Sequence, residues 1–143
     1  MDYSFPVVRT THPKARPADE TKLGFAKYFT DHMFAMDWDE GLGWHDGRVV
    51  PHEPLLIEPA SCVLHYAQMM FEGMKAYRTA DGEIQIFRPD MNVKRMARTC
   101  ERMCIPELPE DLLVAAVRAV IKEDIDWVPK APGTALYIRP FNF

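Results

Sequence analysis

Two segments in the second half of the chain carry apolar residues at helical spacing. Asp90 stands where a helix N-cap would be at the start of residues 90–104. Pro109 opens the second segment, and Glu110 and Asp111 follow it, where acidic side chains favour the positive end of a helix. The pattern predicts two amphipathic helices. Their buried stripes would be Val93, Met96, Ala97, Cys100, Met103 and Cys104 in the first, and Leu112, Leu113, Ala116, Val117, Val120 and Ile121 in the second.

The first half of the chain has little helical character and reads as strands and turns. Residues 28–38 are rich in aromatic side chains and are predicted to form a long strand. A turn is expected at residues 39–43, and Gly47 indicates another near it. Residues 48–51 and 54–57 are predicted to be short extended pieces.

The middle of the chain combines a short helix with a hairpin. Residues 66–71 could form one helical stretch, which Glu72 and Gly73 would break. Residues 74–78 are then predicted to leave as a strand and residues 84–89 to return. The loop between them contains Asp-Gly, the strongest short hairpin signal.

The last segment, residues 135–143, is predicted to be a strand. Because alternate side chains of a strand share a face, Leu136 and Ile138 would point to the core, and Tyr137 and Arg139 would share the other face. A guanidinium there must be wet, paired or in contact with a ligand. The residues alone leave two readings open: a surface arginine paired to a carboxylate, or a ligand site.

Arg95, Arg98 and Arg102 follow one another at helical spacing in the first predicted helix. They form either a solvated basic edge or, through one arginine, a bidentate site for a phosphate. Cys100 and Cys104 are four residues apart, and we expect a buried apolar pair there rather than a metal site. The five histidines show no metal-ligand spacing, so no metal is predicted.

Composition narrows the class of protein. The chain has 143 residues, of which 48% are hydrophobic, enough for one globular domain. A net charge of −4 argues against nucleic-acid binding. The three cysteines make a disulfide framework unexpected, and no leader or membrane-spanning segment is recognised, so we expect a cytoplasmic protein away from membranes. The predicted fold class is α/β, of α+β character: a mainly antiparallel sheet flanked by helices, preceded by an extended arm at residues 1–22 that is flexible at its start.

Four stretches, taken together, resemble a known family. They are FTDHMFAMDWDEGLGW (29–44), LHYAQMMFEGMKAYR (64–78), FRPDMNVKRMARTCERMCIP (87–106) and DWVPKAPGTALYIRPF (126–141). In order and spacing they resemble the N-terminal small domain of branched-chain amino-acid aminotransferases, within the fold-type IV group of enzymes dependent on pyridoxal phosphate. The resemblance covers residues 23–143.

The resemblance implies a role for particular residues. Arg95, in NVKRM, matches the arginine that binds the cofactor phosphate. Tyr137 and Arg139 match the pair that lines the substrate site, where the arginine helps to hold the second carboxylate of glutamate. The walls of the hydrophobic pocket match Phe71, in FEG, and Phe25, in FAKYF. A further match, Tyr66, implies a tyrosine that reaches the neighbouring subunit of a homodimer.

The resemblance also implies an activity. The parent protein would be a transaminase that moves the amino group between Leu, Ile or Val and 2-oxoglutarate, with pyridoxal 5'-phosphate as cofactor, in branched-chain amino acid biosynthesis. The catalytic lysine of the family lies in a K-x-G-G-N-Y-like stretch after the YxR strand, and no such stretch occurs here. We therefore expect residues 23–143 to be a small domain truncated before the large cofactor-binding domain. The chain alone should be inactive and should bind the cofactor weakly or not at all.

Two other functions remain open at this stage. Within the same group of enzymes, a D-amino-acid aminotransferase or aminodeoxychorismate lyase is the alternative, although FTDHM and DWVP disfavour it. The second alternative is a non-catalytic interaction domain that keeps the small-domain fold. The joint presence of Arg95, Tyr66, Phe71, Tyr137 and Arg139 makes that reading less attractive, because a structural descendant has no physical reason to keep them.

Overall fold

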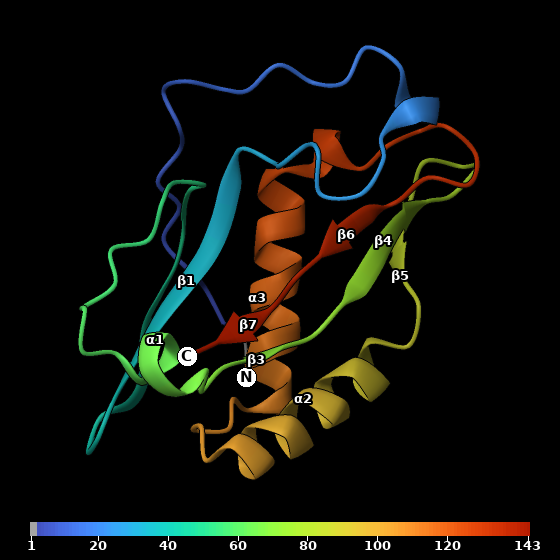
Figure 1. Ribbon diagram of the computed structural model, residues 1–143. Helices are drawn as coiled ribbons and strands as arrows, with labels where there is room; N and C mark the ends of the chain where they lie inside the picture. The colour runs from blue at the N-terminus through green and yellow to red at the C-terminus, as the bar shows by residue number, and fades with distance from the viewer. Residues whose placement is uncertain (1–2) are drawn as a thin grey trace.

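A computed structural model describes residues 3–143 of the chain. Within these described residues, three helices and seven strands lie in the order ββαβββααββ, with two short 3₁₀ turns at Glu20–Lys22 and Ile125–Trp127 (Figure 1). The helices are α1 (Cys62–Tyr66), α2 (Pro89–Met103) and α3 (Glu110–Glu123). The strands are β1 (His32–Asp39), β2 (Gly43–Pro51), β3 (Met70–Phe71), β4 (Met74–Arg78), β5 (Ile84–Ile86), β6 (Leu136–Ile138) and β7 (Phe141–Asn142).

All pairings between the named strands are antiparallel, and they form three small sheets. One is the β1–β2 hairpin, the second pairs β3 with β7, and the third has the order β5-β4-β6. The second and third sheets are successive parts of one ladder, because β3 and β4 follow each other in the chain and pair with β7 and β6. The predicted class, helices on a mainly antiparallel sheet, is confirmed.

The core lies between α2, α3 and the inner face of β4. Alternation along β4 buries Met74 and Ala76 and leaves Lys75 and Tyr77 exposed. The two amphipathic helices bury most positions of the predicted stripes, but Ala97, Met103 and Val120 are only partly buried and Cys104 is exposed. The buried cluster consists of Met70, Met74, Ala76, Val93, Met96, Cys100, Ile105, Leu113, Val117, Ile121 and Val128.

Several predicted segments are shifted or interrupted. The strand expected at 28–38 begins at His32, because Asp31 instead accepts hydrogen bonds from the Lys14 amide (2.7 Å) and the Trp127 indole (2.9 Å). The helix expected at 66–71 lies at 62–66 and ends where Ala67 adopts a left-handed conformation. Met70 belongs to a strand because it pairs with β7 and is buried.

Other boundaries differ for local reasons. Gly47 lies inside β2 rather than in a turn, where a Cβ would come within 2.7 Å of the Met36 methyl carbon. The residue that precedes α2 is Arg88, so Asp90 is not the N-cap but lies in the first turn and pairs with Arg88. Cys104 is exposed at the end of α2, so the predicted buried cysteine pair is wrong for that member.

The remaining differences concern extended segments. The returning strand ends at Ile86, short of the predicted residue 89. Residues 54–57 form no strand, whereas residues 48–51 belong to β2. The strand predicted at 135–143 is divided into β6 and β7 by Arg139 and Pro140.

The arm runs along the hairpin and reaches the end of α3. The Val8 amide donates to the Val49 carbonyl (2.9 Å), and the Val49 amide donates to the Pro6 carbonyl (3.0 Å). Arg9 then pairs with Glu123 at the end of α3, with 2.6 Å between Nε and Oε1. This part of the arm therefore lies against β2 and the end of α3. Its very start, residues 1–2, lies outside the described residues, and so does that part of the flexibility prediction.

A buried histidine–aspartate pair joins β1 to the residue after α3. His32 donates from its backbone amide to Asp124 Oδ2 (2.8 Å), and its Nδ1 lies 2.7 Å from Asp124 Oδ1. The Thr10 amide donates to His32 Nε2 (3.0 Å), which therefore acts as an acceptor and leaves the proton on Nδ1. One residue of the arm thus fixes the tautomer that holds the hairpin to α3.

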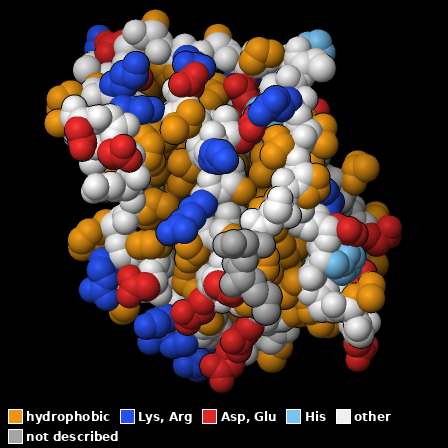
Figure 2. All heavy atoms as spheres, turned by 180° about the vertical axis from the view of Figure 1, so that it is seen from behind, with side chains coloured by type: hydrophobic (Ala, Val, Ile, Leu, Met, Phe, Trp, Pro, Cys, Tyr) orange, Lys and Arg blue, Asp and Glu red, His pale blue; other side chains and the backbone are white. Residues whose placement is uncertain are grey.

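Charges of both signs lie side by side on the surface. Figure 2 shows the face opposite to that of Figure 1, where basic and acidic side chains alternate between apolar ones. Among residues 3–143, no helix is long and apolar enough to cross a bilayer.

Candidate functional site

A break between β3 and β4 is the centre of the candidate site. Glu72 and Gly73 separate the two strands, although the Glu72 amide still donates to the Pro140 carbonyl (2.8 Å) of the facing strand. The backbone therefore keeps its partner on one side while the Glu72 side chain turns toward α2. Breaks of this kind re-aim a side chain without loss of the strand register around it.

The Glu72 carboxylate is buried and accepts hydrogen bonds from three residues. Arg95 on α2 approaches it with two nitrogens: Nε lies 2.8 Å from Oε2, and Nη2 contacts Oε1. The Gly73 amide donates to Oε1 (2.7 Å), and Asn92 Nδ2 lies 3.4 Å from the same oxygen. Asn92 also donates to the Gly73 carbonyl (3.0 Å), so one face of α2 holds both residues of the break.

Electrostatics keep this carboxylate ionised. Burial by itself would raise the pKa of Glu72, but the hydrogen bonds from Arg95, Gly73 and Asn92 outweigh burial and lower the pKa below its ordinary value. The Arg95 pKa is raised in turn, chiefly by its hydrogen bond to Glu72. The pair is therefore charged at neutral pH.

Tyr137 on β6 and Arg139, which directly follows that strand, lie on the same side of the chain, as the alternation predicted. Arg139 Nη2 donates to the Tyr137 hydroxyl (3.0 Å), and the guanidinium carbon lies 4.4 Å from the centre of the Phe71 ring. Phe25 meets Tyr137 edge-on, with 5.1 Å between ring centres. Gly73 lies directly against the tyrosine, since a Cβ there would come within 2.1 Å of the hydroxyl oxygen.

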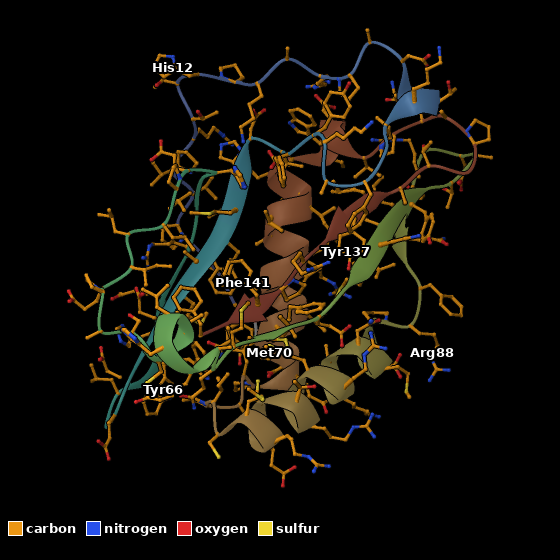
Figure 3. All side chains as sticks on the ribbon, in the orientation of Figure 1. His12, Tyr66, Met70, Arg88, Tyr137 and Phe141 are labelled. Atoms are coloured by element: carbon orange, nitrogen blue, oxygen red, sulfur yellow. The ribbon has the colours of Figure 1, made fainter. Side chains whose placement is uncertain are left out.

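The structure brings together five of the six residues that the sequence singled out. Phe25, Phe71, Tyr137 and Arg139 form one contact cluster. Arg95 joins it through Glu72 and Gly73. Tyr66 is apart: it lies on α1 with 80% of its surface exposed, on the other side of the view from Tyr137 (Figure 3).

Sequence reasoning missed Glu72, Asn92 and Gly73 as parts of the site. Glu72 and Gly73 were assigned only the role of ending a helix. Asn92 precedes Arg95 by three residues, which places both on one helix face, and this spacing was the available signal. The partner of that face could not be found without the fold.

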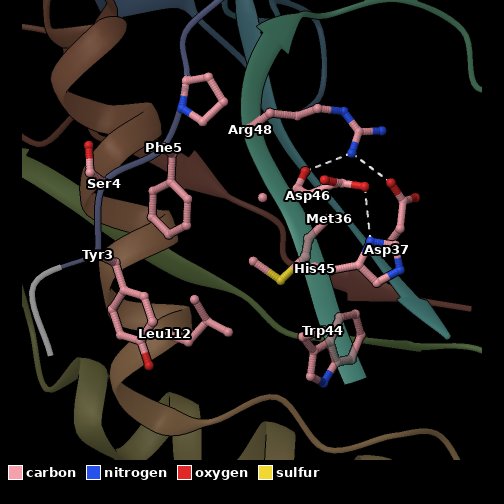
Figure 4. A pocket seen from close by; sticks show the side chains of 12 residues that line it. Tyr3, Ser4, Phe5, Met36, Asp37, Trp44, His45, Asp46, Arg48 and Leu112 are labelled. Atoms are coloured by element: carbon pink, nitrogen blue, oxygen red, sulfur yellow. Dashed lines mark hydrogen bonds and ion pairs between the residues drawn. The ribbon is translucent and has the colours of Figure 1, made fainter. Parts of the chain in front are cut away.

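A cavity of about 670 Å³ lies elsewhere, between the arm and the β1–β2 hairpin (Figure 4). Tyr3, Phe5 and Met36 line it, and Arg48 at its side pairs with Asp37 at 2.6 Å. None of the six candidate residues lines this cavity. We place the candidate site at the cluster of Phe25, Phe71, Tyr137 and Arg139 beside the break between β3 and β4, because the candidate side chains meet there.

Within residues 3–143, no three histidine, cysteine, aspartate or glutamate side chains are grouped as metal ligands would be. The donors at the candidate site are guanidinium, amide and hydroxyl groups around one paired carboxylate. Such a set suits a small anion.

Solved structures first define the class of protein that this fold resembles. A branched-chain amino acid aminotransferase of T.th. with pyridoxamine 5'-phosphate matches 80% of this chain and 32% of its own, with a TM-score of 0.58 and 28% identity. The same enzyme complexed with N-(5'-phosphopyridoxyl)-L-glutamate matches 66% of this chain and 30% of its own, with a TM-score of 0.54 and 32% identity. No family model matches the chain.

Curated relatives then specify the resemblance. Branched-chain-amino-acid transaminase 1 of Bacillus subtilis (strain 168) is 53% identical over 133 residues, which are 93% of this chain and 37% of the relative. The branched-chain-amino-acid aminotransferase of Mycobacterium tuberculosis (strain CDC 1551 / Oshkosh) is 48% identical over 143 residues, or 97% of this chain and 39% of the relative. The resemblance seen in the sequence is confirmed. The chain spans less than two fifths of the length of these relatives.

Proposed function

We propose that the chain is the N-terminal part of a transaminase that depends on pyridoxal phosphate and exchanges the amino group between Leu, Ile or Val and 2-oxoglutarate. The observation that supports it best is the meeting of Arg95 with Tyr137 and Arg139 around one strand break, in a chain about half identical to relatives named for that reaction. Residues 23–143 would be the small domain and residues 1–22 an arm.

Arg95 fits the proposed role of a cofactor-phosphate ligand. A guanidinium has five N–H donors on two edges. Glu72 occupies the edge formed by Nε and Nη2, while 61% of the Arg95 side chain is exposed. The second edge can therefore reach a phosphate in bidentate fashion. A single arginine gives weak binding, so the remaining contacts would come from a large domain.

The cluster around Tyr137 fits a substrate site. Pyridoxal phosphate supplies an electron sink for the substrate α-carbon. This chain would orient the substrate: Phe71 and Phe25 provide rigid apolar walls for branched side chains, and Arg139 provides a cation for the second carboxylate of glutamate. Arg139 is held against Phe71 and the Tyr137 hydroxyl, so it lies at the edge of the apolar surface rather than within it.

Tyr66 supports a homodimer in this proposal. Its ring is largely exposed on α1, and it lies apart from Tyr137 (Figure 3). A tyrosine so placed is free to enter the site of a neighbouring subunit. We assign the dimer to the cytoplasm and to branched-chain amino acid biosynthesis, in line with the reaction proposed.

Two assays test the proposal. In the first, the full-length protein that contains this chain is supplied with pyridoxal phosphate, 2-oxoglutarate and each of L-Leu, L-Ile, L-Val and D-Ala. Glutamate formation from the three branched L-amino acids, and not from D-Ala, is expected. Transfer from D-Ala alone would establish the D-amino-acid alternative, and no transfer from any donor would favour the non-catalytic interaction domain.

The second assay uses the 143-residue chain by itself. We expect no transamination, because the residues that match the family include no catalytic lysine. Cofactor binding should be weak, since Arg95 would be the only phosphate ligand contributed. Turnover, or tight and saturable binding of pyridoxal phosphate by this chain, would contradict the proposed division of labour between two domains.

A further inference from the structure

We propose that Glu72 is a positioning residue: it fixes the Arg95 guanidinium and, through Gly73, sets the place of the Tyr137–Arg139 pair. The sequence resemblance assigned Glu72 no role. The role of Arg95 as a phosphate ligand rests on the proposed function. The contacts by which Glu72 holds Arg95 and Gly73 do not depend on it.

Glu72 is much more deeply buried than Arg95, and this indicates that Glu72 fixes the position of Arg95. Only 3% of the Glu72 side chain is exposed, against 61% of the Arg95 side chain. A buried carboxylate must be paired, so the arginine is drawn to a fixed point at the break. An ordinary surface pair has two mobile ends and little effect on position. Here one end is anchored in the interior.

The anchor has further donors that fix its orientation. The Gly73 amide donates to Oε1, and Asn92 lies against the same oxygen. With Arg95 on both oxygens, the carboxylate plane is determined. The guanidinium must lie near that plane to make two contacts, so its free edge points in one direction.

The same anchor reaches the substrate face. Asn92 holds the Gly73 carbonyl at 3.0 Å, and Gly73 has no room for a Cβ beneath the Tyr137 hydroxyl. That hydroxyl accepts the hydrogen bond from Arg139. A movement of Glu72 would therefore displace Gly73, and with it Tyr137 on β6 and Arg139 just after that strand. The Glu72 carboxylate would thus fix the position of Arg95, the proposed phosphate ligand, relative to Tyr137 and Arg139, the proposed substrate ligands.

The first experiment measures the order of Arg95 in the 143-residue chain by NMR of ¹⁵N-arginine side chains. Arg95→Lys assigns the Arg95 Nε–H signal by its disappearance. Glu72→Gln keeps the side-chain size but removes the charge, and we expect the Nε–H proton to exchange with water about tenfold faster. The Tyr137 ring signals should shift as well.

A matched control is Glu101→Gln, which removes an exposed carboxylate from α2, the helix that carries Arg95. It should leave both sets of signals unchanged. Circular dichroism verifies folding of each variant. If Glu72→Gln does not fold, Glu72→Asp keeps the charge but shortens the reach, and the same loss of order is expected. An Arg95 signal that exchanges at the wild-type rate in the folded variant would overturn the proposal.

The second experiment uses the full-length protein and the dissociation constant of pyridoxal phosphate measured by equilibrium dialysis. Glu72→Gln should weaken binding about tenfold, and Glu101→Gln should not. Wild-type affinity in Glu72→Gln would overturn the positioning role while the proposed function stands. If the wild-type protein binds no cofactor, the proposed function fails, and the NMR measurement still decides whether Glu72 holds Arg95.

Discussion

Gly73 is the residue at which the geometry leaves the least freedom. A Cβ at this position would stand 2.1 Å from the Tyr137 hydroxyl oxygen and 2.9 Å from its Cζ, far inside van der Waals contact. We expect Gly73→Ala to lower the free energy of unfolding by about 1–3 kcal/mol, because the ring must move and lose its place beside Arg139. Urea unfolding of the two proteins measures this difference.

Tyr137→Phe supplies the control for that substitution. It removes the oxygen that causes the closest approach and costs only the exposed hydrogen bond from Arg139. The double variant should therefore recover part of the loss caused by Gly73→Ala. Equal stability of Gly73→Ala and the wild type would show that the tyrosine can move without cost.

His45 provides a pH dependence of known sign. Its ring nitrogens lie 3.0 Å from Asp46 Oδ2 and 2.9 Å from Asp39 Oδ2, and these hydrogen bonds raise its pKa above the ordinary value near 6.5. A raised pKa gives stability that is fully present below about pH 6.5 and is lost as the pH rises through the folded-state pKa. The wild type should therefore lose its stability advantage over His45→Gln as the pH rises.

The measurement is the difference in urea midpoint between wild type and His45→Gln from pH 5.5 to 8.5. Subtraction matters because His52 has a pKa lowered by burial and by Lys14, so it acts in the opposite direction. A flat difference for His45→Gln would contradict the assignment.

At the residue scale, the sequence could predict contacts between residues that are near each other in the chain, but not contacts between distant ones. The alternation that places Tyr137 and Arg139 on one face is a local property of a strand, and it was predicted correctly. The carboxylate that holds Arg95 comes from 23 residues away. No periodicity relates Glu72 to Arg95, so their pairing follows only from the packing of α2 beside β3.

Among the secondary-structure elements, the junction of arm, hairpin and α3 is the best test of packing. Asp124 is buried and accepts two hydrogen bonds from His32. We expect Asp124→Ala to lower the free energy of unfolding by about 3 kcal/mol, because two buried donors lose their acceptor. The shift of the urea midpoint at constant slope measures it.

A neighbouring carboxylate gives the comparison. Asp126 pairs with Arg16 on the surface, where 70% of its side chain is exposed. Asp126→Ala should change stability by less than about 1 kcal/mol. Similar losses in both variants would mean that burial of the His32–Asp124 pair contributes nothing beyond an ordinary surface contact.

Element prediction succeeded where the pattern was long and failed where contacts decide. The two amphipathic helices were found because each carries several turns of regular spacing. The short helix was displaced by about four residues, because Gln68 is fixed instead by the Met103 carbonyl (3.0 Å) and Met70 by pairing with β7. Both partners lie more than 30 residues away in the sequence.

For the molecule as a whole, the outer face of the sheets exposes aromatic side chains that can drive self-association. Phe25, Phe71, Phe141 and Phe143 are 67%, 59%, 47% and 48% exposed, and the rings of the last two stack at 6.0 Å. Exposed aromatic surface of this kind favours association. We expect the 143-residue chain to self-associate. Phe141→Ser should raise the concentration at which half of the chain is associated about tenfold.

Sedimentation velocity over a range of concentrations measures that association. Leu42→Ser, at the tip of the β1–β2 hairpin with 74% exposure, is the matched control because it removes exposed apolar surface elsewhere. It should leave that half-association concentration unchanged. A chain that stays monomeric at every concentration would contradict the expectation.

The contact between arm and helix has a consequence for synthesis on the ribosome. Arg9 and Glu123 are 114 positions apart, and at 5–20 residues per second the ribosome needs roughly 6 to 23 s to make the second after the first. During that interval the nascent arm has no final partner at α3, and the buried side of the β1–β2 hairpin stays accessible. A chaperone that recognises apolar segments would meet its target in this window, before residue 123 has been translated.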